Sequence, residues 1–211
     1  MKRVAGLSKL SAMWKHVPNI LTFIRLGMTF IFLGMILYSP HVANHSFFLD
    51  VAFAIFVVAG LTDVIDGHVA RHFNASSKFG RMIDPLVDKV LVCGAFICFA
   101  IIGVPKLFDW DPTTLAIVHW LVVGVLVLRE TYVTVLRQMA EARGINFAAV
   151  ISGKIKMFVQ TFAIGTVIIK TAHVPDALWG QWFTLITFAA MIAITVYSGL
   201  DATRRTKAVQ S

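Results

Sequence analysis

Six long apolar segments constrain the fold of this 211-residue chain more than any other feature of its sequence. Each approaches the ~20 residues that an α-helix needs to cross the hydrocarbon core of a bilayer. Hydrophobic residues make up 58% of the chain and charged residues only 14%, which is typical of an integral membrane protein. The sequence therefore predicts an all-α fold of six transmembrane helices, spanning about Asn19 to Tyr38, Phe47 to Asp66, Phe79 to Gly103, Thr113 to Leu136, Phe147 to Lys170 and Leu178 to Leu200.

The first 17 residues contain four basic side chains among apolar residues that recur every three or four positions. This pattern predicts an amphipathic helix that lies on the membrane surface. A targeting peptide is the competing interpretation, but the apolar run that follows contains Arg25 and has no small-residue cleavage pattern. We therefore expect an interfacial helix over 1–17, a six-helix domain over 18–205 and a tail over 206–211.

Basic residues are distributed unevenly among the linkers between these segments. The linker over 39–45 contains no Lys or Arg, whereas the next linker lies among Arg71, Lys78 and Arg81. Most other basic residues lie at the two ends of the chain and around Arg143. Because cytoplasmic loops are enriched in Lys and Arg, both termini and the linker after Arg71 are expected on the cytoplasmic side of the cell membrane. The net charge of +8 then indicates topology and anionic ligands rather than nucleic acid.

Two helical stripes beside the linker after Arg71 carry four carboxylates and several small residues. The first stripe recurs at i, i+3, i+4 and i+7, and the second at i, i+4 and i+8. Their residues are Asp63, Asp66, Gly67 and Ala70, followed by Gly80, Asp84 and Asp88. If the stripes face each other, the acids require cations, because like charges at contact distance cannot all remain ionised. Pairing with arginines is the alternative, but this stretch does not provide four cations on matching faces.

The spacing of these residues, Asp-x2-Asp-Gly-x2-Ala-Arg-x8-Gly-x3-Asp-x3-Asp, resembles the signature of the CDP-alcohol phosphatidyltransferases, and no position of it is missing. The resemblance implies a membrane enzyme, a homodimer, that transfers a phosphatidyl group from CDP-diacylglycerol to an alcohol. It also implies that Asp63, Asp66, Asp84 and Asp88 hold metal ions and that Asp88 takes the proton of the acceptor hydroxyl. Whether Asp88 is base, ligand or both stays open.

The residue types of this motif suit that chemistry. Hard carboxylate oxygens suit Mg²⁺ or Mn²⁺, and four carboxylates can hold two such ions as a clamp on a diphosphate. Gly67 and Ala70 leave room for a nucleobase, and Arg71 offers a planar donor fork to phosphate or base oxygens. We expect CDP-diacylglycerol to be bound by Thr22, Asp63, Asp66, Gly67, Ala70, Arg71 and Gly80.

The first predicted membrane helix has a polar edge, because Asn19, Thr22 and Arg25 recur every three residues. An arginine at the centre of a bilayer costs roughly 2.5–3.5 kcal/mol on insertion scales, so Arg25 is expected either to have a partner or to extend to the interface. The pattern Pro-Asn-x-Leu-Thr-x-x-Arg, which starts at Pro18, resembles the branch of the family that uses glycerol 3-phosphate as acceptor. This resemblance favours a role for Arg25 in the site.

The fourth and fifth segments carry further basic residues. Arg129 and Arg137 are eight positions apart and therefore share a helix face. A surplus of cations beside a cytoplasmic site suits a phosphorylated acceptor, although the same residues could set topology or contact anionic lipid heads. The patterns Arg-Glu-x5-Leu-Arg and Gly-Lys-x-Lys resemble the same branch, with Met157 where that branch often has Thr. We expect the acceptor phosphate to be bound by Arg25, Arg129, Arg137, Lys154 and Lys156.

These patterns together predict transfer of the phosphatidyl group from CDP-diacylglycerol to glycerol 3-phosphate, giving phosphatidylglycerol phosphate and CMP with two divalent cations. Another acceptor, such as inositol phosphate, serine or a second lipid, is the alternative within the family. A divalent-cation transporter is the alternative from a different class, because acids within membrane helices often mark ion pathways. Against it, the remaining aspartates lie in or beside linkers on the opposite side, so no chain of acids crosses the bilayer.

Overall fold

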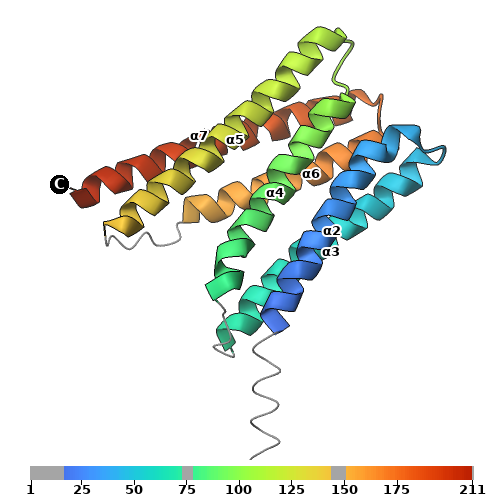
Figure 1. Ribbon diagram of the computed structural model, residues 1–211. Helices are drawn as coiled ribbons and strands as arrows, with labels where there is room; N and C mark the ends of the chain where they lie inside the picture. The colour runs from blue at the N-terminus through green and yellow to red at the C-terminus, as the bar shows by residue number, and fades with distance from the viewer. Residues whose placement is uncertain (1–16, 73–77, 144–150, 211) are drawn as a thin grey trace, which may run out of the picture.

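The computed structural model describes the backbone of residues 17–72, 78–143 and 151–210, and the side chains of residues 22–62, 85–143 and 151–205. Within these ranges the regular elements are six long helices and one short 3₁₀ helix, η1 (Ser39–His41) (Figure 1). All six long helices are long and apolar enough to cross a membrane, which confirms the predicted all-α, six-span fold. They are α2 (Val17–Tyr38), α3 (His45–His72), α4 (Lys78–Ile102), α5 (Pro112–Ala142), α6 (Ile151–His173) and α7 (Leu178–Gln210). The predicted interfacial helix lies outside the described residues, apart from Val17, where α2 begins.

Several helices continue beyond the apolar segments that predicted them. Helix α3 ends at His72 rather than near Asp66, and α5 ends at Ala142 rather than near Leu136. Hydropathy marks only the part of a helix that the hydrocarbon core surrounds, whereas backbone hydrogen bonding can continue into the polar interface. The polar ends of these helices are therefore available to line a site at the membrane surface.

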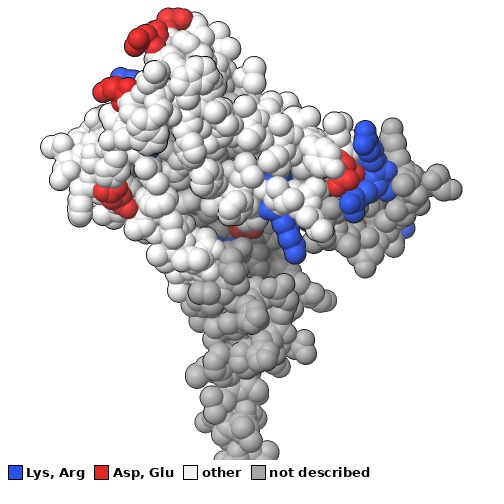
Figure 2. Space-filling model, turned by 180° about the vertical axis from the view of Figure 1, so that it is seen from behind, with Lys and Arg blue, Asp and Glu red and all other residues white. Residues whose placement is uncertain are grey.

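The helix ends are arranged so that one end of the molecule carries the sequence motifs. In Figure 1 the starts of α2, α4 and α6 and the ends of α3, α5 and α7 lie along the left and lower sides of the molecule. The opposite end carries the linkers over 39–44, 103–111 and 174–177, each of which contains a proline that interrupts helical hydrogen bonding. The exposed residues Asp50, Asp109 and Asp176 lie in or beside these linkers, whereas Arg204 and Arg205 lie near the end of α7. Figure 2 shows acidic side chains at the upper left and a group of basic side chains at the right.

Helix α5 begins with a side-chain cap. Asp111 precedes Pro112, and its Oδ2 accepts a hydrogen bond of 3.0 Å from the backbone N–H of Thr114. The Thr114 hydroxyl donates to Oδ1 of the same carboxylate at 2.6 Å. These bonds, the hydroxyl bond first and the backbone bond second, lower the pKa of Asp111 because they favour its charged form. The cap fixes where α5 starts and hence which of its residues face the other helices.

The helices pack through aromatic and very small residues. Helix α2 contacts both α3 and α4, α5 contacts α4 and α7, and α6 contacts α3 and α7. Phe32 of α2 and Phe56 of α3 are buried, with ring centroids 5.2 Å apart. Gly94 brings α4 close to α2, since a Cβ at that position would lie 2.8 Å from Cδ1 of Leu33. Such close approach maximises van der Waals contact, on which helix association in lipid depends.

Candidate functional site

A cavity of about 650 Å³ opens between α4, α5 and α6. The structure brings to its wall four of the cations that were predicted to bind an acceptor phosphate, together with the last aspartate of the acidic motif. These residues are Asp88, Arg129, Arg137, Lys154 and Lys156. Residues more than sixty positions apart in the sequence therefore meet around one space that a small anionic molecule could occupy.

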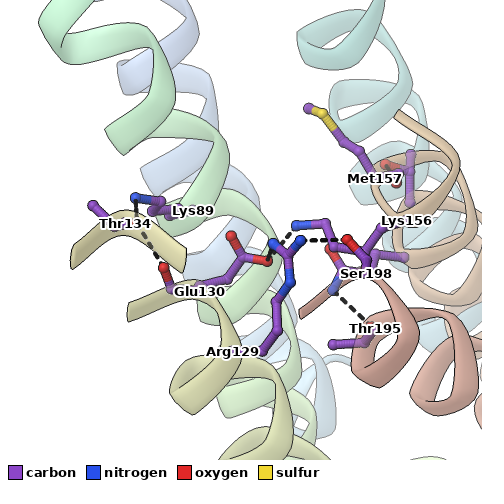
Figure 3. A network of polar contacts seen from close by, with 10 residues as sticks. Lys89, Arg129, Glu130, Thr134, Lys156, Met157, Thr195 and Ser198 are labelled. Atoms are coloured by element: carbon purple, nitrogen blue, oxygen red, sulfur yellow. Dashed lines mark hydrogen bonds and ion pairs between the residues drawn. The ribbon is translucent and has the colours of Figure 1, made fainter. Parts of the chain in front are cut away.

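Glu130 is the centre of an ion-pair network on one side of this cavity (Figure 3). Its Oε1 accepts a hydrogen bond of 3.1 Å from Nη1 of Arg129 and a second bond from Nζ of Lys156. Nη2 of Arg129 donates to the hydroxyl of Ser198 on α7. These three charged side chains are no more than 13% exposed, so their charges need the partners they have found. The network fixes two cations of α5 and α6 in place.

Arg129 also retains an unused donor at this position. Its Nε is buried and has no hydrogen-bond partner among the described residues. A buried donor of this kind normally has a protein, water or ligand partner. Glu130 and Ser198 hold the other two nitrogens of Arg129, so Nε is the one nitrogen of this guanidinium group without a described partner.

Arg25 of α2 reaches the cavity through Asp88. Nη1 of Arg25 lies 3.3 Å from Oδ1 of Asp88, and the two side chains are 2% and 28% exposed. The structure thus gives Arg25 the partner that its position within a membrane helix calls for. Thr22, one turn earlier on α2, is buried as well. Arg25 therefore contacts the acid that faces the cavity.

The acidic motif lies on the two helices that flank the linker over 73–77. Asp63, Asp66, Gly67, Ala70 and Arg71 belong to α3, and Gly80, Asp84 and Asp88 belong to α4. Asp88 is the one member of the motif whose side chain the structure describes, so the other predicted metal and CDP-diacylglycerol positions in the motif lie outside the described side chains. The end of α3 and the start of α4 lie at the same end of the molecule (Figure 1).

The donor set of this motif fits divalent cations. Carboxylate oxygens are the ligands that Mg²⁺ and Mn²⁺ prefer, and two adjoining helices supply four of them. Among the described side chains alone there is no group of three metal-ligating residues, because three of the four aspartates fall outside that part of the chain.

Several residues of the cavity wall and of the ion-pair network were not among the predicted site residues, among them Glu130 at the centre of the network. Lys89 and Thr134 line the cavity, and Nζ of Lys89 donates to the Thr134 hydroxyl. Ser198 holds Arg129 from α7. Lys89 could have been proposed as a site residue because it directly follows Asp88 of the acidic motif. Ser198 lies in a segment that carries no recognisable motif.

Comparison with known proteins places this chain in a family. The model of the CDP-alcohol phosphatidyltransferase family matches residues 15–198. The chain belongs to this family. A probable phosphatidylglycerophosphate synthase of Mycobacterium tuberculosis (strain ATCC 25618 / H37Rv) is 34% identical over 206 residues, which are 96% of this chain and 85% of that protein.

Two further relatives carry the name CDP-diacylglycerol--glycerol-3-phosphate 3-phosphatidyltransferase. The Bacillus subtilis (strain 168) protein is 32% identical over 194 residues, which cover 88% of this chain and 92% of the relative. The Salmonella choleraesuis (strain SC-B67) protein is 27% identical over 188 residues, with the same two shares. As a CDP-alcohol phosphatidyltransferase the chain is a multi-pass membrane transferase, and membership of this family counts against the cation-transporter alternative.

Proposed function

We propose that this protein transfers the phosphatidyl group of CDP-diacylglycerol to glycerol 3-phosphate, giving phosphatidylglycerol phosphate and CMP. The observation that carries the proposal is the meeting of Arg129, Arg137, Lys154 and Lys156 with Asp88 around one cavity. An acceptor that carries a phosphate gains from such a cluster of cations, whereas serine or a lipid hydroxyl brings no surplus negative charge. The names of the relatives favour glycerol 3-phosphate over inositol phosphate.

The acidic motif would form the donor half of the site. Asp63, Asp66 and Asp84, with Asp88, would hold two divalent cations, either Mg²⁺ or Mn²⁺. When bound, these ions supply charge neutralisation on the diphosphate and on the departing CMP. The side chains proposed to bind CDP-diacylglycerol around them are those of Thr22, Asp63, Asp66, Gly67, Ala70, Arg71 and Gly80.

Asp88 would serve as the general base. It faces the cavity in which we place the acceptor, and an alcohol becomes an effective nucleophile only as its proton is removed. The acceptor oxygen bonds to the phosphorus of the phosphatidyl group, its proton passes to the Asp88 carboxylate, and the bond from that phosphorus to the oxygen of CMP breaks. The Arg25 contact holds the carboxylate in place for this step, in addition to the phosphate-binding role predicted for Arg25.

We place the reaction at the cytoplasmic face of the cell membrane. Basic residues at the ends of α5 and α7 and acids in the opposite linkers favour this orientation (Figure 2). Acyl chains of the donor would remain in the bilayer while its nucleotide reaches the aqueous cavity. We also expect a homodimer, as the family resemblance implies.

A comparison of acceptors, each supplied separately, tests the proposal. Purified protein receives CDP-diacylglycerol, Mg²⁺ and one labelled acceptor at a time: glycerol 3-phosphate, inositol phosphate or serine. We expect CMP release and labelled lipid only with glycerol 3-phosphate, and loss of both in Asp88→Asn, by about 10²- to 10⁴-fold for removal of a general base. Transfer to serine or inositol phosphate without transfer to glycerol 3-phosphate would overturn the choice of acceptor.

A further inference from the structure

We propose that Lys89 is a further ligand of the acceptor phosphate, which it binds from the α4 side of the cavity. This inference rests on the proposed function and adds a residue that the sequence motifs do not assign. It follows from the place of Lys89 in the cavity wall, from the partner of its ammonium group and from the way the neighbouring charges are paired.

Lys89 lies beside Asp88, the proposed general base, in the cavity wall. It follows Asp88 directly on α4, and both residues line the cavity. Consecutive helical residues point about 100° apart, so the two side chains cover adjoining parts of the same wall. An acceptor that presents its hydroxyl to Asp88 therefore passes close to the Lys89 side chain.

The ammonium group of Lys89 is positioned by Thr134 of α5. Nζ donates to the Thr134 hydroxyl at 2.5 Å, and that hydroxyl donates its own proton to the Glu130 carbonyl at 2.6 Å. The hydroxyl proton is therefore committed, which leaves its lone pairs to receive the lysine. An ammonium group has three N–H donors, so two remain for a ligand after the bond to Thr134.

The charge of Lys89 differs from those of its neighbours in how it is balanced. Arg129 and Lys156 share the Glu130 carboxylate, and Asp88 is paired with Arg25. Among the described residues, Lys89 has a neutral hydroxyl as its hydrogen-bond partner and forms no ion pair. A half-buried ammonium group without a carboxylate gains most from an anion that arrives in the cavity. A phosphate fits this need because it offers several acceptor oxygens and negative charge together.

Steady-state kinetics of Lys89→Met and Lys89→Arg test the inference, with Lys106→Met as the matched control. Lys106 is an exposed lysine of the α4–α5 linker at the opposite end of the molecule. Loss of a charge-assisted bond predicts a KM for glycerol 3-phosphate raised about 10- to 100-fold in Lys89→Met. The KM for CDP-diacylglycerol should stay within about twofold, Lys89→Arg should recover part of the loss, and Lys106→Met should match the wild type. Calorimetric binding of glycerol 3-phosphate, with Mg²⁺ and CMP present, should weaken in parallel.

Two results would overturn the assignment of Lys89 without touching the proposed function. One is a wild-type enzyme that uses glycerol 3-phosphate and a Lys89→Met variant with an unchanged KM for it. The other is an equal rise in the KM values of both substrates. If Lys89→Met does not fold, Thr134→Val tests the inference, because it keeps the charge of Lys89 and removes the hydroxyl that positions its ammonium group. Thr134→Val should raise the KM for glycerol 3-phosphate several-fold, and an unchanged KM would overturn the inference. Failure of the wild type to use glycerol 3-phosphate would instead refute the proposed function.

Discussion

The contact between Arg25 and Asp88 joins a residue that is costly to insert into a membrane to the residue on which the proposed reaction depends. A guanidinium group buried among apolar helices requires a partner, and a carboxylate that must accept a proton requires a fixed direction. One ion pair of 3.3 Å meets both needs. Its two members are 63 positions apart, so the sequence could indicate that Arg25 needs a partner but not which acid it meets.

Substitution of Arg25 tests this positioning role. We expect Arg25→Met to lower kcat by roughly 10- to 100-fold, because a base displaced by about 1 Å loses catalytic efficiency of that order. Arg25→Lys should recover only part of it, since a compact ammonium group does not reproduce the planar guanidinium. Arg205→Met, at the exposed end of α7, is the control. An unchanged kcat with a raised KM for glycerol 3-phosphate would show instead that Arg25 acts only as a phosphate ligand.

Among single residues, the charged side chains that belong to sequence patterns could be singled out from the sequence. The cations of α5 and α6 were identified from their sequence patterns, and the structure places Arg129, Arg137, Lys154 and Lys156 around one cavity. Ser198 was not predictable, because a serine in an apolar helix is common and its importance comes only from the arginine opposite it.

Helix α7 contributes to the site through Ser198, whose hydroxyl accepts a hydrogen bond from Arg129. We expect Ser198→Ala to raise the KM for glycerol 3-phosphate by about 3- to 10-fold, since it removes one hydrogen bond from a charged group that must stay oriented. Thr187→Ala is a matched control on the same helix, because that hydroxyl donates to the Phe183 carbonyl of α7 itself. Equal effects of the two substitutions would contradict a specific role for Ser198.

The N-terminal cap of α5 predicts a pH-dependent contribution to stability. The pKa of Asp111 is lowered in the folded protein, so its contribution is present above the unfolded pKa of about 4 and is lost as the pH falls through the folded value. Asp111→Ala should therefore lower the thermal unfolding midpoint in detergent at pH 7, and the difference from wild type should shrink below about pH 4. Asp109→Ala, an exposed change in the same linker, is the control. A difference of equal size at pH 7 and pH 3 would rule out this account of the cap.

The six helices follow from the lengths of the apolar segments, but their neighbours do not. Segment length and hydropathy predicted each span, whereas the close approach of Gly94 to Leu33 and the ring contact between Phe32 and Phe56 depend on which helices meet. Hydropathy does not distinguish such pairings, because most lipid-facing and most helix-facing residues are apolar alike. For the same reason it could not place the cavity between α4, α5 and α6.

For the whole molecule, the orientation in the membrane can be tested by cysteine labelling. In a variant with Cys93 and Cys98 replaced by serine, a cysteine at Lys106 should react with an impermeant maleimide added outside intact cells. A cysteine at Arg143, which caps the C-terminus of α5 at the end of the molecule that carries the motifs, should react only after the membrane is permeabilised. The reverse pattern would place the acidic motif on the outer face and contradict a cytoplasmic site.

The central claim is that the acidic motif of α3 and α4 and the basic cavity between α4, α5 and α6 are two halves of one active site. An experimental structure with Mn²⁺, CMP and glycerol 3-phosphate, which cannot react with each other, tests it most directly through the anomalous scattering of manganese. We predict two manganese peaks at the carboxylates of Asp63, Asp66, Asp84 and Asp88, with the acceptor phosphate in the cavity near Arg129, Arg137 and Lys154. Manganese at another position, or glycerol 3-phosphate bound outside this cavity, would contradict the account.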